Sequence, residues 1–352
     1  MKYSFKIGSA WSIPIELHIT FILLMVVVLI FTFPQLYLFT LILFLFVFVV
    51  VHELAHSWVA RRYNIKVRKI VLYPIGGVSE IEEIPDNPRI EWRMAIAGPL
   101  ASFGIGGVLL GLDQIVTIET PPLPFIMVTA NLFSTLGILN LFLGAFNLIP
   151  AFPMDGGRVF RALLAERMSY ADATKYASFL GRILGILMAV VGIFYNIFLT
   201  IIGIFIYIGA SEETEQTIVS TTLARVRVKD VMNPEVSVAT PETTLAEALE
   251  IMFKARYHDI LIENEGVFQG IVTWDEIMKI KPDQRIGMRL EQFPKKHVSI
   301  TPDESVLEAH RIMTNEKIDL LPVVSREAPE KVVGVLTNEG VSYAYQKAKS
   351  LR

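Results

Sequence analysis

A run of apolar residues that ends in two histidines constrains the fold of this chain most. Residues 36–51 are almost purely apolar, and they lead directly into His52-Glu53-Leu54-Ala55-His56. Together with this motif the run is long enough to cross the hydrocarbon core of a bilayer, which takes about 20 residues of α-helix. Because ionisable side chains are costly at that depth, a functional role for them is the default interpretation.

The spacing of the two histidines predicts a metal site. Residues i and i+4 of a helix lie on one face, one turn apart, so both imidazoles can reach a single ion. Glu53 lies between them, where its carboxylate can polarise water and carry its proton. A metal-free hydrogen-bonded cluster of the three side chains is the alternative, which the cost of burying such groups in lipid disfavours.

Composition divides the chain into a membrane part and a soluble part. Of the 352 residues, 53% are hydrophobic and 19% are charged, a charged share below the roughly 25% usual for soluble proteins. Residues 1–210 are mostly apolar, and the change of character falls at the polar run Ser211–Thr217. We therefore predict a polytopic α-helical membrane domain over residues 1–210, a linker over 211–225 and a soluble α/β domain after it.

Absent residue types narrow the chemistry. The chain has no cysteine, which excludes disulfides and thiolate ligands and leaves His, Asp and Glu to bind a metal. The net charge of −3 implies no nucleic-acid partner. No cleavable signal peptide is evident, because the first apolar segment lacks a small-residue cleavage site and runs past signal-peptide length.

The membrane part divides into about six predicted spans. They cover about Ile13–Phe33, Gln35–Val59, Trp92–Leu112, Phe125–Leu148 and Phe179–Ile208, and the last segment makes two short spans if Tyr195-Asn196 is a turn. One kinked helix is the alternative for that segment. Residues 64–91 are not helical in pattern, and their alternation around Gly76-Gly77 predicts short strands with a Gly-Gly bend.

Basic residues orient these spans. Lys and Arg occur in segments 1–12, 60–93 and 151–182, whereas the loops near Pro34, 113–124 and 195–196 hold none. By the positive-inside rule, six spans place both termini and the soluble domain in the cytoplasm of a multi-pass cell-membrane protein. Five spans would place the soluble domain outside. The orientation brings His52, His56 and Asp155 to the same side at similar depth.

Asp155 is the best candidate for a third metal ligand. A catalytic zinc site keeps three protein ligands and one open position. Asp155 follows a proline-broken stretch and precedes Gly156-Gly157, at the matching membrane level. Asp113 and Glu119 fall on the far side by the charge argument, and His18 begins a different span. A helix N-cap is the alternative role for Asp155.

An exposed strand edge near Gly76-Gly77 could pair with an extended substrate by adding a strand. A surface hairpin is the alternative, and the pattern alone does not separate the two.

The soluble part repeats itself. Thr240-Pro241 and Ala248…Ile251-Met252 recur as Thr301-Pro302 and Ala309…Ile312-Met313, at an offset of 61 residues (302 − 241). An apolar strand and a Gly-x-x-Thr segment follow each time, ending at Thr273 and Thr337. The pattern predicts two units of strand, helix, strand, strand, helix over residues 226–285 and 286–352.

Residues 1–210 resemble the site-2 protease family of intramembrane metalloproteases. The similarity rests on His52–His56, on Gly76-Gly77, on Ala97-Gly98-Pro99 and on Asn147–Arg158, an NxxPxxPxDGG pattern. It implies one Zn²⁺ per chain held by His52, His56 and Asp155, with Glu53 as general base or acid. It also implies that Asn147 helps to hold the substrate or the developing oxyanion, and that the Gly76-Gly77 strand pairs with the substrate.

The repeats resemble tandem cystathionine-β-synthase-type (CBS) domains, through Lys229-Asp230-Val231-Met232 and the repeated landmarks above. This resemblance implies an adenine nucleotide as a candidate ligand, with Thr273, Glu276 and Thr337 as candidate contacts. Gly340 stands where the second repeat would need an acidic residue. A dimerisation or scaffolding module is the alternative, and a homodimer through the CBS domains is a candidate assembly.

These observations predict an intramembrane zinc endopeptidase. It would cut a transmembrane segment of another membrane protein near the cytoplasmic end, with the CBS pair modulating access. The alternative is a transporter or channel with regulatory CBS domains. That alternative predicts inverted repeats among the spans, and the sequence shows none.

Overall fold

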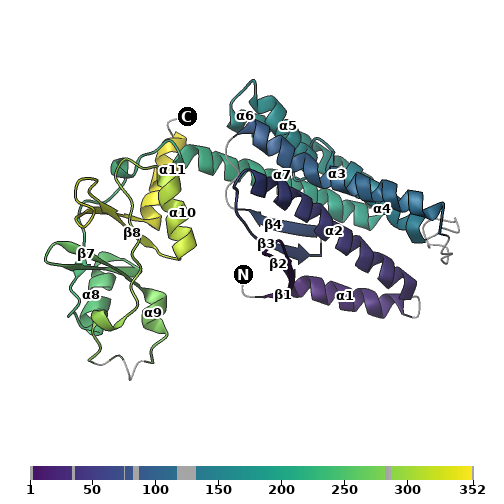
Figure 1. Cartoon of the computed structure of the whole chain (residues 1–352). Helices are drawn as coiled ribbons and strands as arrows, with labels where there is room; N and C mark the ends of the chain where they lie inside the picture. The colour runs from purple at the N-terminus through teal and green to yellow at the C-terminus, as the bar shows by residue number, and fades with distance from the viewer. Residues whose placement is uncertain are drawn as a thin grey trace. The chain divides into compact units, whose positions relative to one another are not determined.

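The computed structural model describes residues 3–33, 36–74, 76–81, 87–116, 132–281, 285 and 287–350. Two compact units make up the chain, Met1–Glu215 and Gln216–Arg352 (Figure 1). The start of the predicted fourth span, Phe125 to about residue 131, lies outside the described residues.

Helices dominate the first unit. They are α1 (Ile19–Thr32), α2 (Leu36–Arg62), α3 (Pro88–Asp113), α4 (Leu132–Asn147), α5 (Asp155–Ala165), α6 (Tyr170–Tyr195) and α7 (Ile197–Leu223). In the part of the chain that is described, α2, α3, α6 and α7 are long and apolar enough to cross a membrane, whereas α1 and α4 are apolar but shorter. The protein is thus a multi-pass membrane protein, and the count of six spans stays a prediction.

A four-stranded sheet accompanies these helices. It contains β1 (Ser4–Ala10), β2 (Ile13–His18), β3 (Val67–Tyr73) and β4 (Gly76–Ile81), in the order β1-β2-β3-β4. β2 and β3 are parallel, and the outer pairs are antiparallel. The strands predicted within residues 64–91 are present, but Gly76 and Gly77 begin β4 and do not form a bend.

The predicted start of the first span at Ile13 is wrong. Residues 13–18 form β2, and the helix begins only at Ile19 behind His18, whose ring accepts a hydrogen bond from the Thr20 N–H. Pairing with β3 decides this, because it satisfies the β2 backbone and places Glu16 Oε2 2.9 Å from Lys69 Nζ. A short apolar segment can be a half-buried strand or the start of a span, and local pattern does not separate the two. The partner strand that would distinguish them is distant in sequence.

The turn predicted at Tyr195-Asn196 is confirmed. α6 ends at Tyr195, and Asn196 Oδ1 accepts the N–H of Phe198 at 2.9 Å as α7 begins. Both helices are longer than two short spans. α7 continues through the polar run 211–217 to Leu223, so the residues predicted as a linker are largely helical.

The second unit contains the two predicted repeats. The first is β5 (Val238–Ala239), α8 (Leu245–Ala255), β6 (Asp259–Asn264), β7 (Val267–Thr273) and α9 (Trp274–Met278); the second is α10 (Val306–Glu316), β8 (Leu320–Val324), β9 (Val332–Thr337) and α11 (Asn338–Ser350). In the second repeat the first strand is reduced to a single parallel bridge from Ile300 to Val323. Val228–Asp230 and Leu290–Gln292 form short 3-10 helices.

The two repeats share a core and a buried carboxylate. Ile271 of the first repeat packs in one cluster with residues of the second, such as Val323 and Leu336. Asp259 Oδ2 accepts the N–H groups of Asp319 and Leu320 at 2.6 and 3.3 Å. A side chain of the first repeat therefore accepts the backbone N–H groups at the start of β8 in the second repeat.

Candidate metal centre

The structure brings His52, His56 and Asp155 together. Both histidines lie on α2, one turn apart, and Asp155 is the first residue of α5. Asp155 Oδ2 lies 3.1 Å from His52 Nε2 and 3.1 Å from His56 Nε2. The three ligand atoms are within 4.8 Å of one another, and both histidines are buried.

α3 orients both imidazoles from their other ring nitrogens. His52 Nδ1 lies 2.9 Å from Ser102 Oγ, and His56 Nδ1 lies 2.7 Å from the Met94 carbonyl oxygen. A carbonyl only accepts, so His56 donates from Nδ1, and its Nε2 faces Asp155. Metal-binding histidines commonly donate their second N–H in this way.

Gly98 leaves the space that a metal ion would need. A Cβ atom at this position would lie 2.3 Å from His56 Nε2 and 2.5 Å from His52 Nε2. Both Nε2 atoms therefore approach a position that any larger residue would fill, slightly beyond the roughly 2.0–2.1 Å at which zinc binds imidazole nitrogen. Two imidazoles and one carboxylate also form a donor set that leaves a fourth position open. The residues present therefore fit a zinc ion.

Glu53 contacts the edge strand β4. Ser79 donates a hydrogen bond to Glu53, with 2.7 Å between Ser79 Oγ and Glu53 Oε2. A Cβ atom at Gly77 would lie 2.6 Å from Glu53 Cγ, so only glycine lets the strand approach this closely. β4 thus packs directly on the predicted general base.

Met94, Ser79 and Ser102 belong to the site but were not predicted from the sequence. Met94, Gly98 and Ser102 are spaced by four along α3, which places them on one face of the helix. Ser79 lies two residues after Gly77, on the same face of β4. Such spacings from Gly77 and Gly98 were the available signal.

Asn147 ends α4 and is half-buried. Its side-chain N–H donates to the Leu143 carbonyl at 3.0 Å. Among the described residues no hydrogen bond joins Asn147 to the two histidines or Asp155.

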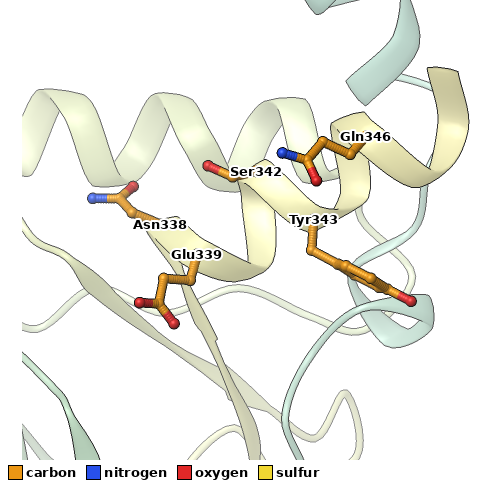
Figure 2. A pocket seen from close by; sticks show the side chains of 5 residues that line it. All are labelled: Asn338, Glu339, Ser342, Tyr343 and Gln346. Carbon is orange, nitrogen blue, oxygen red and sulfur yellow. The ribbon is translucent and has the colours of Figure 1, made fainter.

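The candidate nucleotide contacts are engaged locally. Thr273 Oγ1 accepts the Glu276 N–H at 3.4 Å as the N-cap of α9, and Thr337 Oγ1 accepts the Gly340 N–H at 3.2 Å. The Glu276 carboxylate pairs with Lys279 at 2.6 Å. An open hollow in this unit lies instead along one face of α11 (Figure 2), lined by Asn338, Glu339, Ser342, Tyr343 and Gln346.

Comparisons with known proteins identify both units. The profile of Peptidase family M50 matches residues 40–117 and 112–188, and the CBS domain profile matches residues 228–283 and 290–346. A zinc metalloprotease of Methanocaldococcus jannaschii is 39% identical over 318 residues, which are 90% of this chain and 89% of the relative. The solved site-2 protease from the same organism is 45% identical, with a TM-score of 0.48, and covers 60% of this chain and 95% of its own.

The match to the zinc metalloprotease extends through both units at an identity that establishes common descent. Both resemblances drawn from the motifs are therefore confirmed. The chain belongs to peptidase family M50, the site-2 type zinc metalloproteases, and carries a C-terminal tandem pair of CBS domains.

Proposed function

We propose that this protein is an endopeptidase that cuts transmembrane segments of other membrane proteins near their cytoplasmic ends. One observation carries the proposal: His52, His56 and Asp155 converge within 4.8 Å, and both histidines lie on a helix that is apolar enough to span a bilayer. A hydrolytic centre at that place acts on peptide bonds within or beside the lipid phase.

In this proposal His52, His56 and Asp155 hold one Zn²⁺. Zinc in such a site acts as a Lewis acid and lowers the pKa of water. Glu53 takes the proton of the attacking water and delivers it to the leaving amine. The bond from Ser79 holds one carboxylate oxygen of Glu53, and the other oxygen, which accepts no hydrogen bond from the described residues, would take the proton. Asn147 helps to hold the substrate carbonyl or the developing oxyanion.

The substrate would pair with the outer edge of β4. This strand is last in the sheet order, and an extended peptide can add to such an edge through main-chain hydrogen bonds. Gly77 and Ser79 place β4 against Glu53. A substrate helix that unwinds and pairs there therefore runs beside the general base.

We further propose six spans, with both termini and the CBS domains in the cytoplasm. The basic segments 1–12, 60–93 and 151–182 support this orientation. The substrate is a membrane protein that reaches the site through the bilayer.

The CBS pair would modulate cleavage, with an adenine nucleotide as the candidate ligand through Thr273, Glu276 and Thr337, and with a homodimer as the candidate assembly. α7 supports a link, because one uninterrupted helix contains both apolar residues of the membrane unit and Leu223, which is buried in the soluble core. Deletion of the CBS pair after Leu223 tests this. Unchanged cleavage, nucleotide response and oligomeric state would reject it.

The central test compares wild type with Glu53→Gln in purified form. We expect one zinc ion per chain in both proteins, because the substitution leaves the ligand set intact, and cleavage of a transmembrane substrate by wild type alone. A zinc-free wild type, or equal cleavage by the variant, would reject the protease. A transporter or channel, the alternative, would have no need of Glu53.

A further inference from the structure

Arg161, in the middle of α5, is buried and bound on several sides. Its side chain is 5% exposed. Its Nε donates to Glu91 Oε1 at 2.8 Å, and its Nη1 donates to Glu213 Oε1 at 2.6 Å. Its Cζ atom lies 4.7 Å from the ring centroid of Phe152 and 4.7 Å from that of Tyr170. A planar guanidinium suits such a site, since it can form forked hydrogen bonds and also contact aromatic rings.

Among the described residues, these partners come from three helices and from the turn that precedes α5. Glu91 lies in the first turn of α3, Tyr170 begins α6 and Glu213 lies on α7. Phe152 is fully buried in the turn that leads from α4 to Asp155. One side chain therefore holds α5 and its preceding turn against three helices.

The position of α5 decides whether the metal centre is complete. Both histidines come from α2, whereas Asp155, the third candidate ligand, comes from α5. The distance of Asp155 from the histidines is therefore set by where α5 lies. Glu91 precedes Met94 by one turn on α3, the helix that also orients both imidazoles. The bond from Arg161 to Glu91 therefore places Asp155 against the same helix that orients His52 and His56.

We propose that Arg161 is a positioning residue for the metal centre, holding α5, and with it Asp155, in line with the two histidines through Glu91 and Glu213. The inference rests on the proposed zinc site. Arg161 itself touches neither the metal position nor the substrate.

The two carboxylate partners differ. Glu91 is buried, with 1% of its side chain exposed, whereas the Glu213 side chain is 23% exposed. Glu213 also lies on α7, which ends at Leu223 in the core of the soluble unit. Because Glu213 is more exposed, solvent weakens its bond to Arg161 more than it weakens the Glu91 bond. A shift of α7 would be transmitted through the Glu213 bond to α5 and so to Asp155.

The test uses the full-length protein in detergent with Co²⁺ in place of zinc, because the visible absorption of Co²⁺ reports the number and arrangement of its ligands. The variants are Arg161→Lys, Arg161→Gln and Glu213→Gln. Arg167→Gln is the matched control, since Arg167 is exposed just beyond the end of α5. Circular dichroism and gel filtration establish that each sample is folded.

We expect both Arg161 variants to bind Co²⁺ more weakly than wild type and with an altered absorption spectrum. The loss should be at most about the 10- to 100-fold seen when a direct partner of a metal ligand is removed, because Arg161 acts through the position of α5. Glu213→Gln should lose less, and Arg167→Gln should match wild type. A folded Arg161→Lys protein with wild-type affinity and spectrum would overturn the proposal, because a lysine cannot reproduce the fork.

If Arg161→Gln does not fold, Arg161→Lys decides the question by the same criterion. If neither Arg161 variant folds, wild-type binding by Glu213→Gln rejects the proposal. A wild type that binds no Co²⁺ would reject the metal centre itself. That result is distinct from failure of the positioning role, in which wild type and variants bind alike.

Discussion

Ser79 Oγ lies 2.7 Å from Glu53 Oε2 and donates a hydrogen bond to it. This contact joins the edge strand β4 to the predicted general base on α2. If a substrate pairs with β4, the strand that receives the peptide is also the strand that fixes the carboxylate. Substrate binding and proton transfer would then both depend on the position of β4.

Loss of this bond should slow the chemical step. We expect Ser79→Ala to lower kcat roughly 10- to 100-fold, because a hydrogen bond to a charged group contributes about 1.5–3 kcal/mol. KM and zinc content should stay unchanged, since neither the β4 backbone nor the ligand set is altered. Ser79→Thr keeps the hydroxyl and should retain most of kcat. Equal kcat for Ser79→Ala and wild type in single-turnover assays would contradict the role.

A methyl group at Gly98 should exclude the metal. The added carbon would lie 2.3 and 2.5 Å from the two Nε2 atoms, in the space where zinc would bind. Gly98→Ala should therefore purify with less than about a tenth of the wild-type zinc, given zinc–nitrogen distances of about 2.0–2.1 Å. Metal analysis of the purified protein measures this.

Gly104→Ala is the control for Gly98. Both glycines lie inside α3, and a Cβ at Gly104 meets nothing within 4 Å. Each substitution favours the helix by about 1 kcal/mol. The two variants therefore differ in whether the added methyl group approaches the histidine nitrogens. A Gly98→Ala protein with full zinc content would show that the metal lies elsewhere.

Ser102 should tune the affinity for zinc. Its hydroxyl lies 2.9 Å from His52 Nδ1 and is fully buried. Ser102→Ala removes the partner that fixes the His52 ring, and such changes typically cost 10- to 100-fold in metal affinity. Competition with a chelator of known affinity measures the change, and a change below about twofold would contradict the prediction.

The local part of the centre was predictable from sequence, and its surroundings were not. The i, i+4 spacing of His52 and His56 fixes their common face by helix geometry alone. Asp155 could be predicted because the proline-broken stretch before it and the glycines after it indicate a turn. For Ser79, Met94 and Ser102 the sequence offers only their spacing from Gly77 and Gly98, because their roles arise only when β4 and α3 pack against α2.

The errors in the fold have the same origin. Ile13–His18 became a strand through pairing with β3, about fifty residues later in the chain, which no local window reveals. The polar run 211–217 stayed helical because it continues α7, and extending a formed helix avoids the cost of nucleation. Tertiary pairing therefore determines the structure of residues 13–18, and continuity with α7 determines that of residues 211–217.

The soluble unit should lose stability as pH rises through the titration of Asp259. Burial raises the pKa of this carboxyl, although hydrogen bonds from the Asp319 and Trp274 N–H groups oppose the effect. The folded state therefore keeps the proton to a higher pH than the unfolded chain, in which the pKa is about 3.9. The contribution of the group to the free energy of unfolding falls between these two pKa values as pH increases, and it is constant outside that window.

Asp259→Asn isolates this contribution because asparagine does not titrate. We expect the free energy of unfolding of wild type minus that of Asp259→Asn to decrease with rising pH from about 3.9, and then to level off. The chain has four tryptophans, so the other three are first replaced by phenylalanine in both proteins. Urea unfolding of these full-length proteins, followed by the fluorescence of Trp274, then measures the difference across that range. A difference that increases with pH would mean that the N–H bonds outweigh burial and that the carboxylate, once ionised, stabilises the junction between the repeats.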